Sequence, residues 1–533
     1  MLRQIEQERS NPLPPQSPPL LMPPAPMQSL GGATVTITVS EFRFAGNTLL
    51  TNRELARAVE SFQGRAVGFA DLQDAAVAVA NAYRKSGWVV RAYLPKQEID
   101  AGTVTIQIIE AKLGAVRVEG VATRVSAARV ENIITASQHP GTPLNVRRLD
   151  RGLLLVNDLP GVLATGRLGA GNNYAESDLV VALEDGSVVN GSFTVDDAGS
   201  RFTGAERLIA AANLNGPFRI GDRADGLVLH SAGSDYQRLA YLLPVGSRGI
   251  RVGANVSHLS YGIVTSDFSA LDAHGTSESF GLEANYPLLR SRLNNLYLAL
   301  NGDDKRFDNS SAGITTTKYS AQTATLGLYA NSFDTLLGGG ASNASVALVR
   351  GRIDLSGSPN EAIDALTVRT AGSFQKLRFS ASRLQVLTRN VSLYAAVSGQ
   401  NADRNLDSSE KLYLGGSTGV RAYPQDEGGG TEGLLFTLEA RTRLPNNFNV
   451  TGFADAGRVR INKLNDIPGA LARNTVELKG AGVSAGWTAS FGLTLSATVS
   501  HRIGSNPNPT STGADQDGSL EKIRFWLQAS MPF

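Results

Sequence analysis

The chain has 533 residues, more than one compact domain normally holds, although a large β-barrel can form a single unit of this size. Its 50 Lys and Arg residues nearly balance 48 Asp and Glu residues, and a net charge of +2 argues against a nucleic-acid-binding arm. Only 18% of residues are charged and 56 are Gly, which fits a lipid-exposed barrel or a large soluble β protein. No segment approaches about 18 consecutive apolar residues, so we expect no transmembrane helix.

The composition also excludes several kinds of chemistry. The absence of Cys excludes disulfides, zinc–thiolate sites and iron–sulfur clusters. The five histidines are scattered, and no paired carboxylates, nucleophile motif or P-loop is present. A G-x-G-x-x-G match at Gly428, Gly430 and Gly433 opens no helix, so we interpret it as a flexible loop. We therefore expect no catalytic residue, no metal, no cofactor and no enzymatic activity.

The first 32 residues differ from everything after them. Residues 1–10 predict a short helix, and eight of the 22 prolines fall in residues 11–30, which predicts an extended linker. The chain begins Met1-Leu2-Arg3 without the apolar core of a signal peptide. Together with the remaining sequence, this indicates a processed form of an exported protein.

Residues 33–187 predict two small α+β modules that share one element order, β-α-α-β-β. Apolar residues at spacings of three and four predict the helices, and alternating runs predict the strands. In the first module, residues 33–113, we expect strands at 34–44, 89–94 and 103–110 and helices around 55–62 and 72–83. In the second module, residues 114–187, we expect strands at 115–118, 162–168 and 178–183 and helices around 130–134 and 149–156.

From residue 188 to residue 533 the apolar period changes to two. The clearest alternating runs are 250–256, 279–288 and 491–500, long enough for tilted strands to cross a bilayer. Backbone groups in hydrocarbon must be paired within the protein, which favours a closed barrel with a polar lumen. A soluble β sandwich also alternates, so the pattern alone leaves both open. At roughly 22 residues per strand and loop, this region would form a 16-stranded antiparallel transmembrane barrel.

The last segment, residues 523–533, favours the membrane alternative. Every odd position is apolar, including Phe525 and Leu527, and the chain stops on Phe533. A terminal aromatic residue on an alternating last strand resembles the signal that bacterial outer-membrane barrels present to their assembly machinery. This resemblance implies that Phe525, Leu527 and Phe533 form an assembly signal. It also implies outer-membrane lipids and the barrel assembly machinery as partners.

Several motifs identify a family. Gly46-Asn47-Thr48-Leu49-Leu50, Tyr83…Gly87-Trp88-Val89 and Ile108-Ile109-Glu110 resemble POTRA domains, the polypeptide-transport-associated modules, with Gly46, Asn47, Gly87 and Glu110 as motif residues. Two such modules before a barrel resemble the transporters of bacterial two-partner secretion, the hemolysin secretion/activation class. Residues 200–204 and 213–222 match the start of that family's barrel.

Two further motifs resemble this family's lumen site. Val420-Arg421-Ala422-Tyr423 resembles the V-R-G-Y tip of a loop that folds into the lumen, here about residues 400–433, with Ala422 in place of Gly. Phe453-Ala454-Asp455-Ala456-Gly457 resembles the F-x-D-x-G strand motif. The resemblance implies that Arg421 meets Asp455 inside the barrel, and strand parity independently places Asp455 on the inward face. The residues implied to anchor or gate the loop are Val420, Arg421, Tyr423, Phe453, Asp455 and Gly457.

The resemblance implies an outer-membrane translocation pore with periplasmic POTRA domains. These would capture an unfolded secreted partner of the adhesin or hemolysin type, which the barrel would export. Residues 1–10 would be a short remnant of the family's plug helix. Two alternatives stay open: an assembly factor for outer-membrane proteins from the same superfamily, and a passive porin. The sequence names neither the secreted partner nor the oligomeric state.

Overall fold

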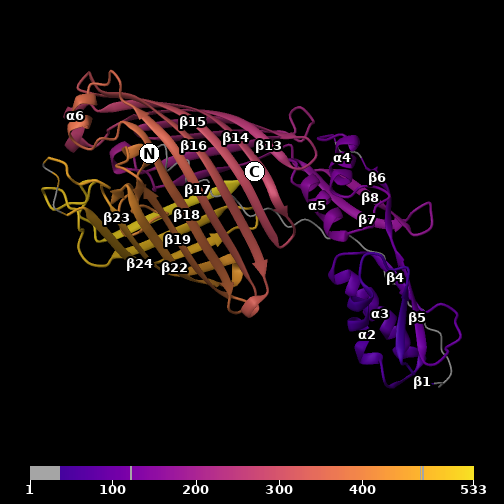
Figure 1. The fold of residues 1–533 in the computed structure, drawn as a ribbon. Coiled ribbons are helices and arrows are strands. Elements are labelled where there is room, and N and C mark those ends of the chain that lie inside the picture. Colours follow the sequence, from indigo (N-terminus) through magenta and orange to yellow (C-terminus); the bar gives the residue numbers. More distant parts are fainter. Residues whose placement is uncertain (1–35, 121–122, 469, 471–472) are drawn as a thin grey trace.

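The computed structural model describes residues 36–120, 123–468, 470 and 473–533. Two small modules follow one another in a row that leads to one end of a long β-barrel (Figure 1). We call this end of the barrel the module end, and the opposite end the far end. The predicted helix at residues 1–10 and the linker at residues 11–30 lie outside the described residues.

The first module is a three-stranded sheet with two helices. Its sheet has the order β2-β5-β4, in which β2 runs parallel and β4 antiparallel to β5. The predicted first strand is divided into β1 and β2, and β1 pairs with a short strand, β3, that we did not predict. The elements are β1 (Ile37–Thr38), β2 (Glu41–Ala45), α2 (Asn52–Val59), β3 (Ala66–Val67), α3 (Phe69–Lys85), β4 (Val90–Tyr93) and β5 (Thr103–Glu110).

The second module repeats the arrangement, with its strands in the order β6-β8-β7. Its first strand begins at Lys112, two residues before the predicted start of the module, and follows β5 almost directly. Leu149, Leu153 and Val156 pack one face of α5 into the module's core, as their spacing predicts. The elements are β6 (Lys112–Glu119), α4 (Ala127–Ser137), α5 (Val146–Asn157), β7 (Val162–Ala170) and β8 (Glu176–Asp185).

The remaining strands form a closed antiparallel barrel of 16 strands, which confirms the predicted fold class. The last strand, β26, closes the barrel against β9 over five residue pairs. Strands β9–β19 are Val189–Asp196, Arg207–Asn215, Arg223–Ser231, Ser234–Val245, Ile250–Gly262, His274–Arg290, Asn294–Ser311, Ile314–Asp334, Gly340–Asp354, Gly372–Val386 and Val391–Ala402. Strands β22–β26 are Glu432–Arg443, Phe448–Arg460, Thr475–Thr488, Thr494–Arg502 and Ile523–Pro532.

Alternation along the strands divides an apolar outer wall from a polar lumen. In β14, Phe280 and Leu282 are 49% and 55% exposed on the outside, whereas Ser277 and Ser279 are buried. Exposed apolar side chains on the outside are the reverse of a soluble sandwich, so the structure favours the membrane alternative. The alternating run 491–500 was predicted too long, because β25 begins only at Thr494 after a tight turn.

A short helix, α6 (Glu361–Leu366), lies in the loop after β17 at the far end of the barrel (Figure 1). The Asp364 carboxylate holds this loop by accepting hydrogen bonds from the backbone of Thr370 and Ala371. No helix in the described part of the chain is both long enough and apolar enough to cross a bilayer.

Candidate functional site

The chain between β19 and β22 folds back into the barrel. Leu412–Tyr413 (β20) and Gly429–Gly430 (β21) form a two-residue ladder within it, and Gly433 belongs to β22. Gly430 and Gly433 therefore lie in paired strands and Gly428 lies in the bend before them, so the interpretation of the whole segment as a flexible loop is wrong for these two glycines. The tip residues Val420, Ala422 and Tyr423 are buried against the barrel wall in a cluster with Leu414, Val459, Val476 and Leu478. We call residues 403–431 the inward loop.

Arg421 at the tip of the inward loop meets Asp455 on β23. The guanidinium donates from Nε and Nη2 to the two Asp455 oxygens, both at 2.8 Å, and the Arg421 backbone N–H donates to Oδ2 at 3.2 Å. The planar guanidinium lies 3.5 Å from the centre of the Phe453 ring. The Asp455 side chain is 0% exposed, so its charge depends on this bidentate partner.

Further groups that the sequence motifs did not include complete the site. Glu439 on β22 accepts from Arg421 Nη1 at 2.8 Å and from Arg441 Nε at 2.7 Å. The Arg421 carbonyl accepts from Ser500 Oγ at 2.7 Å and from Trp526 Nε1 at 2.8 Å. The inward position of Glu439 could have been predicted from the alternation along β22, because Leu434, Phe436 and Leu438 lie on the outward face and odd-numbered residues therefore point into the lumen. Nothing in the sequence linked Ser500 or Trp526 to the loop.

Two glycines on the barrel wall make room for the inward loop. A Cβ on Gly457 would lie 2.7 Å from a Leu414 methyl carbon, so the last residue of the F-x-D-x-G motif allows close packing. A Cβ on Gly480 would lie 2.5 Å from the Ala422 methyl group. Ala422 does not have a positive φ, so the residue in place of the usual Gly is accommodated without backbone strain.

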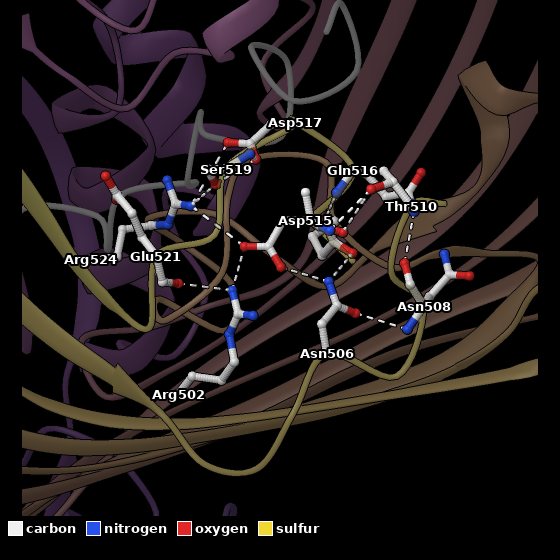
Figure 2. A network of polar contacts seen from close by, with 12 residues as sticks. Arg502, Asn506, Asn508, Thr510, Asp515, Gln516, Asp517, Ser519, Glu521 and Arg524 are labelled. Carbon is white, nitrogen blue, oxygen red and sulfur yellow. Dashed lines mark hydrogen bonds and ion pairs between the residues drawn. The ribbon is translucent and has the colours of Figure 1, made fainter. Parts of the chain in front are cut away.

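A second loop, residues 503–522 between β25 and β26, is fastened to the inward loop at the far end. Glu427 of the inward loop is fully buried and accepts from the Gln516 backbone N–H at 2.8 Å and Asn506 Nδ2 at 3.1 Å. Figure 2 shows Asp515 between Arg502, Asn506 and Arg524; it forms an ion pair with Arg502 and accepts from Asn506 Nδ2 at 2.6 Å. The docked inward loop is thus held at its tip and at its base.

In the first module, three of the four POTRA motif residues meet at the turn after β2. Glu110 accepts hydrogen bonds from the backbone N–H groups of Thr48 at 2.7 Å and Leu49 at 2.9 Å, and from the Tyr83 hydroxyl at 2.9 Å. Gly46 has φ +86°, and a Cβ there would lie 2.3 Å from the Ile108 carbonyl oxygen. Asn47 Nδ2 donates to the Leu50 carbonyl at 3.0 Å.

Gly87, the fourth motif residue, lies elsewhere, at the junction of the two modules. Its carbonyl accepts from the backbone N–H of Val146, the first residue of α5, at 2.8 Å. A Cβ on Gly87 would lie 3.0 Å from the Asn145 side-chain oxygen, so the absence of a side chain permits this approach. The N-terminus of α5 is therefore attached to the first module.

Residues along α5 and just after it attach the second module to the barrel. Asp158, which follows the helix, receives a bidentate pair from Arg290 at 2.9 and 2.7 Å, and the Arg290 side chain is only 2% exposed. Asp150 forms an ion pair with Arg292, and Arg151 Nη2 donates to the Pro287 carbonyl at 2.9 Å. One helix thus connects the first module with the strand ends at the module end of the barrel.

The C-terminal residue lies at the barrel seam. Phe533 exchanges two backbone hydrogen bonds of 3.0 Å with Gly191 near the start of β9, and its ring centre lies 5.1 Å from that of Phe193. Phe525 and Leu527 point outward and are 63% and 58% exposed. Within the described ranges, no group of three or more His, Asp or Glu side chains could hold a metal ion.

We predict that the Glu110 contacts make the first module less stable in acid. Partial burial opposes ionisation, but hydrogen bonds from Thr48, Leu49 and Tyr83 outweigh it and hold the pKa of Glu110 below its usual range. A depressed pKa adds stability above the unfolded pKa of about 4.3, and this stability is lost as the pH falls through the folded pKa. Glu110→Gln should cost about 1–2 kcal/mol near pH 7 and flatten this dependence.

Urea unfolding at pH 7 and pH 4 measures the free energy of unfolding of the first module. Trp88 fluorescence reports on this module in a chain whose other two tryptophans are replaced by Phe. Glu41→Gln changes an exposed carboxylate on the neighbouring strand β2 and serves as the control. Equal pH dependence in the wild-type chain and Glu110→Gln would contradict the assignment.

A 16-stranded barrel with a lumen loop, preceded by two β-α-α-β-β modules, defines an outer-membrane transporter with POTRA domains. Residues 175–489 match the family described as haemolysin secretion/activation protein ShlB/FhaC/HecB, and residues 37–111 match the POTRA domain of ShlB type. The family match spans more than half of the chain, and the chain belongs to this family. It is a two-partner secretion transporter of the bacterial outer membrane, and its POTRA modules lie on the periplasmic side.

Relatives and solved structures agree with this assignment. The heme/hemopexin transporter protein HuxB of Haemophilus influenzae is 25% identical over 506 residues, covering 91% of this chain and 85% of HuxB. The outer membrane transporter CdiB of Dickeya dadantii is 22% identical over 449 residues, covering 80% of this chain and 77% of that protein. The structure of CdiB from Escherichia coli has the same fold, with a TM-score of 0.72, 20% identity and coverage of 100% of this chain and 96% of CdiB.

Proposed function

We propose that this transporter captures an unfolded secreted partner of the adhesin or hemolysin type in the periplasm and exports it through the barrel. The free edge of β7 in the second module carries this proposal. Asn157 covers one position of that edge, because its side-chain amide donates to the Ala164 carbonyl at 2.8 Å and accepts from the Ala164 N–H at 2.9 Å. The next two residues on the same side, Gly166 and Leu168, have no edge-side partner among the described residues.

An open strand edge suits an unfolded chain. Strand addition uses main-chain hydrogen bonds and therefore demands little of the partner's sequence. Asn157 already uses its amide as a strand would at Ala164, and the binding of a peptide would continue the same row of hydrogen bonds. Exposed side chains of the same strand, Leu163 and Thr165, would then lie beside those of the partner.

Cysteine cross-linking tests the proposal, because the natural chain has no Cys and one introduced residue is unique. Thr165→Cys on β7 should cross-link to cysteines placed along the N-terminal region of the secreted partner. Glu131→Cys on the exposed face of α4 is the matched control on the same module and should not. Equal labelling of both positions, or none at Thr165→Cys while binding persists, would refute capture at this edge.

We further propose that the Arg421–Asp455 pair holds the inward loop in its docked state, and that export of the partner requires this docking. The bidentate geometry, the 0% exposure of the Asp455 side chain and the Phe453 ring support this role. We also propose that Phe533, with Phe525 and Leu527, is the signal that the barrel assembly machinery binds during biogenesis. Its place at the seam, where the last strand meets the first, supports that role.

The two alternatives are less well supported. The structure of BamA from Haemophilus ducreyi has a similar fold, with a TM-score of 0.53 and 15% identity, which is a likeness of fold only. The family match instead favours secretion over an assembly factor. A passive porin would need neither the two modules nor a lumen loop that is fastened at both tip and base.

A further inference from the structure

Two arginines on the outer wall of the barrel lie directly above its lipid-facing residues. Along β17, Val346 and Leu348 are 41% and 49% exposed and face outward, whereas Val349 and Ile353 are buried inside the barrel. Side chains alternate along a strand, so Arg350 and Arg352 share the outward face of Val346 and Leu348, and both are exposed. They follow the lipid-facing pair toward the far end, which is the extracellular end.

The two strands beside β17 also change from outward apolar residues to outward polar residues at this level. On β16, outward-facing Leu326 is followed by Ala324 and Gln322, which pair with Arg350 and Arg352. On β18, outward-facing Leu377 is followed by Gln375 and Ser373, which pair with the same two arginines. On each of the three adjacent strands the outward leucine gives way to a polar residue within four positions, which places the arginines at the level where acyl chains give way to headgroups.

Neither arginine has an acidic partner directly across the sheet. Their paired positions are Ala, Gln and Ser, and neither forms an ion pair within the part of the chain that the structure describes. Asp354, two residues beyond Arg352 on the same face, interacts electrostatically with Arg352 without forming an ion pair, and it accepts hydrogen bonds from the Ser356 backbone at 3.0 Å and hydroxyl at 2.6 Å. Asp304 on β15 accepts from the Gln322 amide at 3.1 Å.

Outward arginines elsewhere at this end are arranged differently. Arg458 and Arg460 on β23 have the same two-residue spacing, but Arg458 pairs with Glu477 at 3.4 Å and Arg460 with Glu432 at 3.7 Å. These pairs neutralise their charge on the barrel itself. The β17 pair therefore combines two arginines, whose Cα atoms lie about 7 Å apart along the strand, with hydrogen-bonding amides beside them and no carboxylate directly across the sheet.

We propose that Arg350 and Arg352, with Gln322 and Gln375, bind the phosphate groups of a phosphorylated lipid in the outer leaflet. A guanidinium group matches a phosphate with two parallel hydrogen bonds, and Arg is preferred over Lys for such contacts. The lipid's acyl chains would lie along Val346, Leu348, Leu326 and Leu377. The site would hold this lipid against β16–β18.

Native mass spectrometry of the detergent-solubilised full chain tests this with three probes: lipid A that carries its phosphates, dephosphorylated lipid A, and inorganic phosphate. The wild-type chain should retain phosphorylated lipid A. Arg350→Gln/Arg352→Gln should weaken retention about 30-fold, because each cation near a lipid surface contributes about fivefold and the two contributions multiply. Arg458→Gln/Arg460→Gln is the matched control and should change retention less than about threefold. Heat-modifiable gel migration checks that each variant folds.

Selective loss in the β17 variant supports the site. Equal retention of dephosphorylated lipid A would overturn it, because the phosphate would then contribute nothing. Equal weakening by both double variants would also overturn it, since the effect would reflect overall charge. Competition by millimolar inorganic phosphate would overturn the assignment to a lipid and indicate a small-anion site instead.

Discussion

Arg421→Ala should abolish most secretion while the barrel still assembles. The substitution removes a bidentate partner from Asp455 and one hydrogen bond from Glu439, whose side chains are 0% and 9% exposed. Leaving the buried Asp455 carboxylate without its charged partner costs about 3–5 kcal/mol, so the docked position of the inward loop should no longer be favoured. The ladder of the 16 strands does not involve this side chain, and heat-modifiable migration should be unchanged. Export of the partner to the medium should fall about tenfold or more.

The matched control for this experiment is Arg441→Ala. Arg441 also pairs with Glu439, but its side chain is 41% exposed and it does not contact the inward loop in any described interaction. Its loss should change secretion little. Arg421→Lys keeps the charge but not the planar fork, so an intermediate effect is expected. Undiminished secretion by Arg421→Ala, or an equal defect in Arg441→Ala, would remove the basis for a docking role.

Asp158→Asn should loosen the second POTRA module from the barrel. Arg290 is 2% exposed and donates to both Asp158 oxygens, and a neutral amide can accept only one of these bonds. A buried guanidinium without its counter-charge costs several kcal/mol, roughly 3–5 by analogy with other buried pairs. Hydrogen exchange at the turn between β14 and β15 and in α5 should rise, and secretion should decrease with it.

Asp150→Asn provides the comparison at the same interface. Its partner Arg292 is 28% exposed, so solvent can replace part of the lost interaction and the effect should be smaller. The double variant Asp158→Asn/Arg290→Leu removes both charges and should recover part of the protection from exchange. Unchanged exchange in Asp158→Asn would mean that the remaining contacts, Asp150 with Arg292 and Arg151 with the Pro287 carbonyl, are enough to hold the module.

The barrel could be predicted from the sequence because its main constraint is local. A strand between lipid and water must alternate at every second residue, and 16 such strands repeat this signal. The ends of strands were less certain, since a residue in a turn can continue the alternation without pairing. Phe491 shows this: it keeps the apolar parity of β25 but lies in the turn before Thr494.

The site was predictable only in part, and the reason is sequence separation. Arg421 and Asp455 were linked by motifs, and Glu439 was accessible to parity. Trp526 donates to the Arg421 carbonyl across 105 positions of sequence, and no local pattern encodes that contact. The docking of Asp158 on Arg290 spans 132 positions and depends on how a separate module sits against the strand ends. Such contacts follow from the closed tertiary structure.

The close approach of Ala422 and Gly480 makes these two positions share the volume of a single methyl group. If residue 480 gained a Cβ, the tip of the loop would have to retreat from the wall, since the two carbons would be 2.5 Å apart. If residue 422 lost its methyl, a small void would remain where the loop now touches β24. The identity of one residue thus limits the other, and an exchange of Gly and Ala between the two positions should be tolerated better than either change alone.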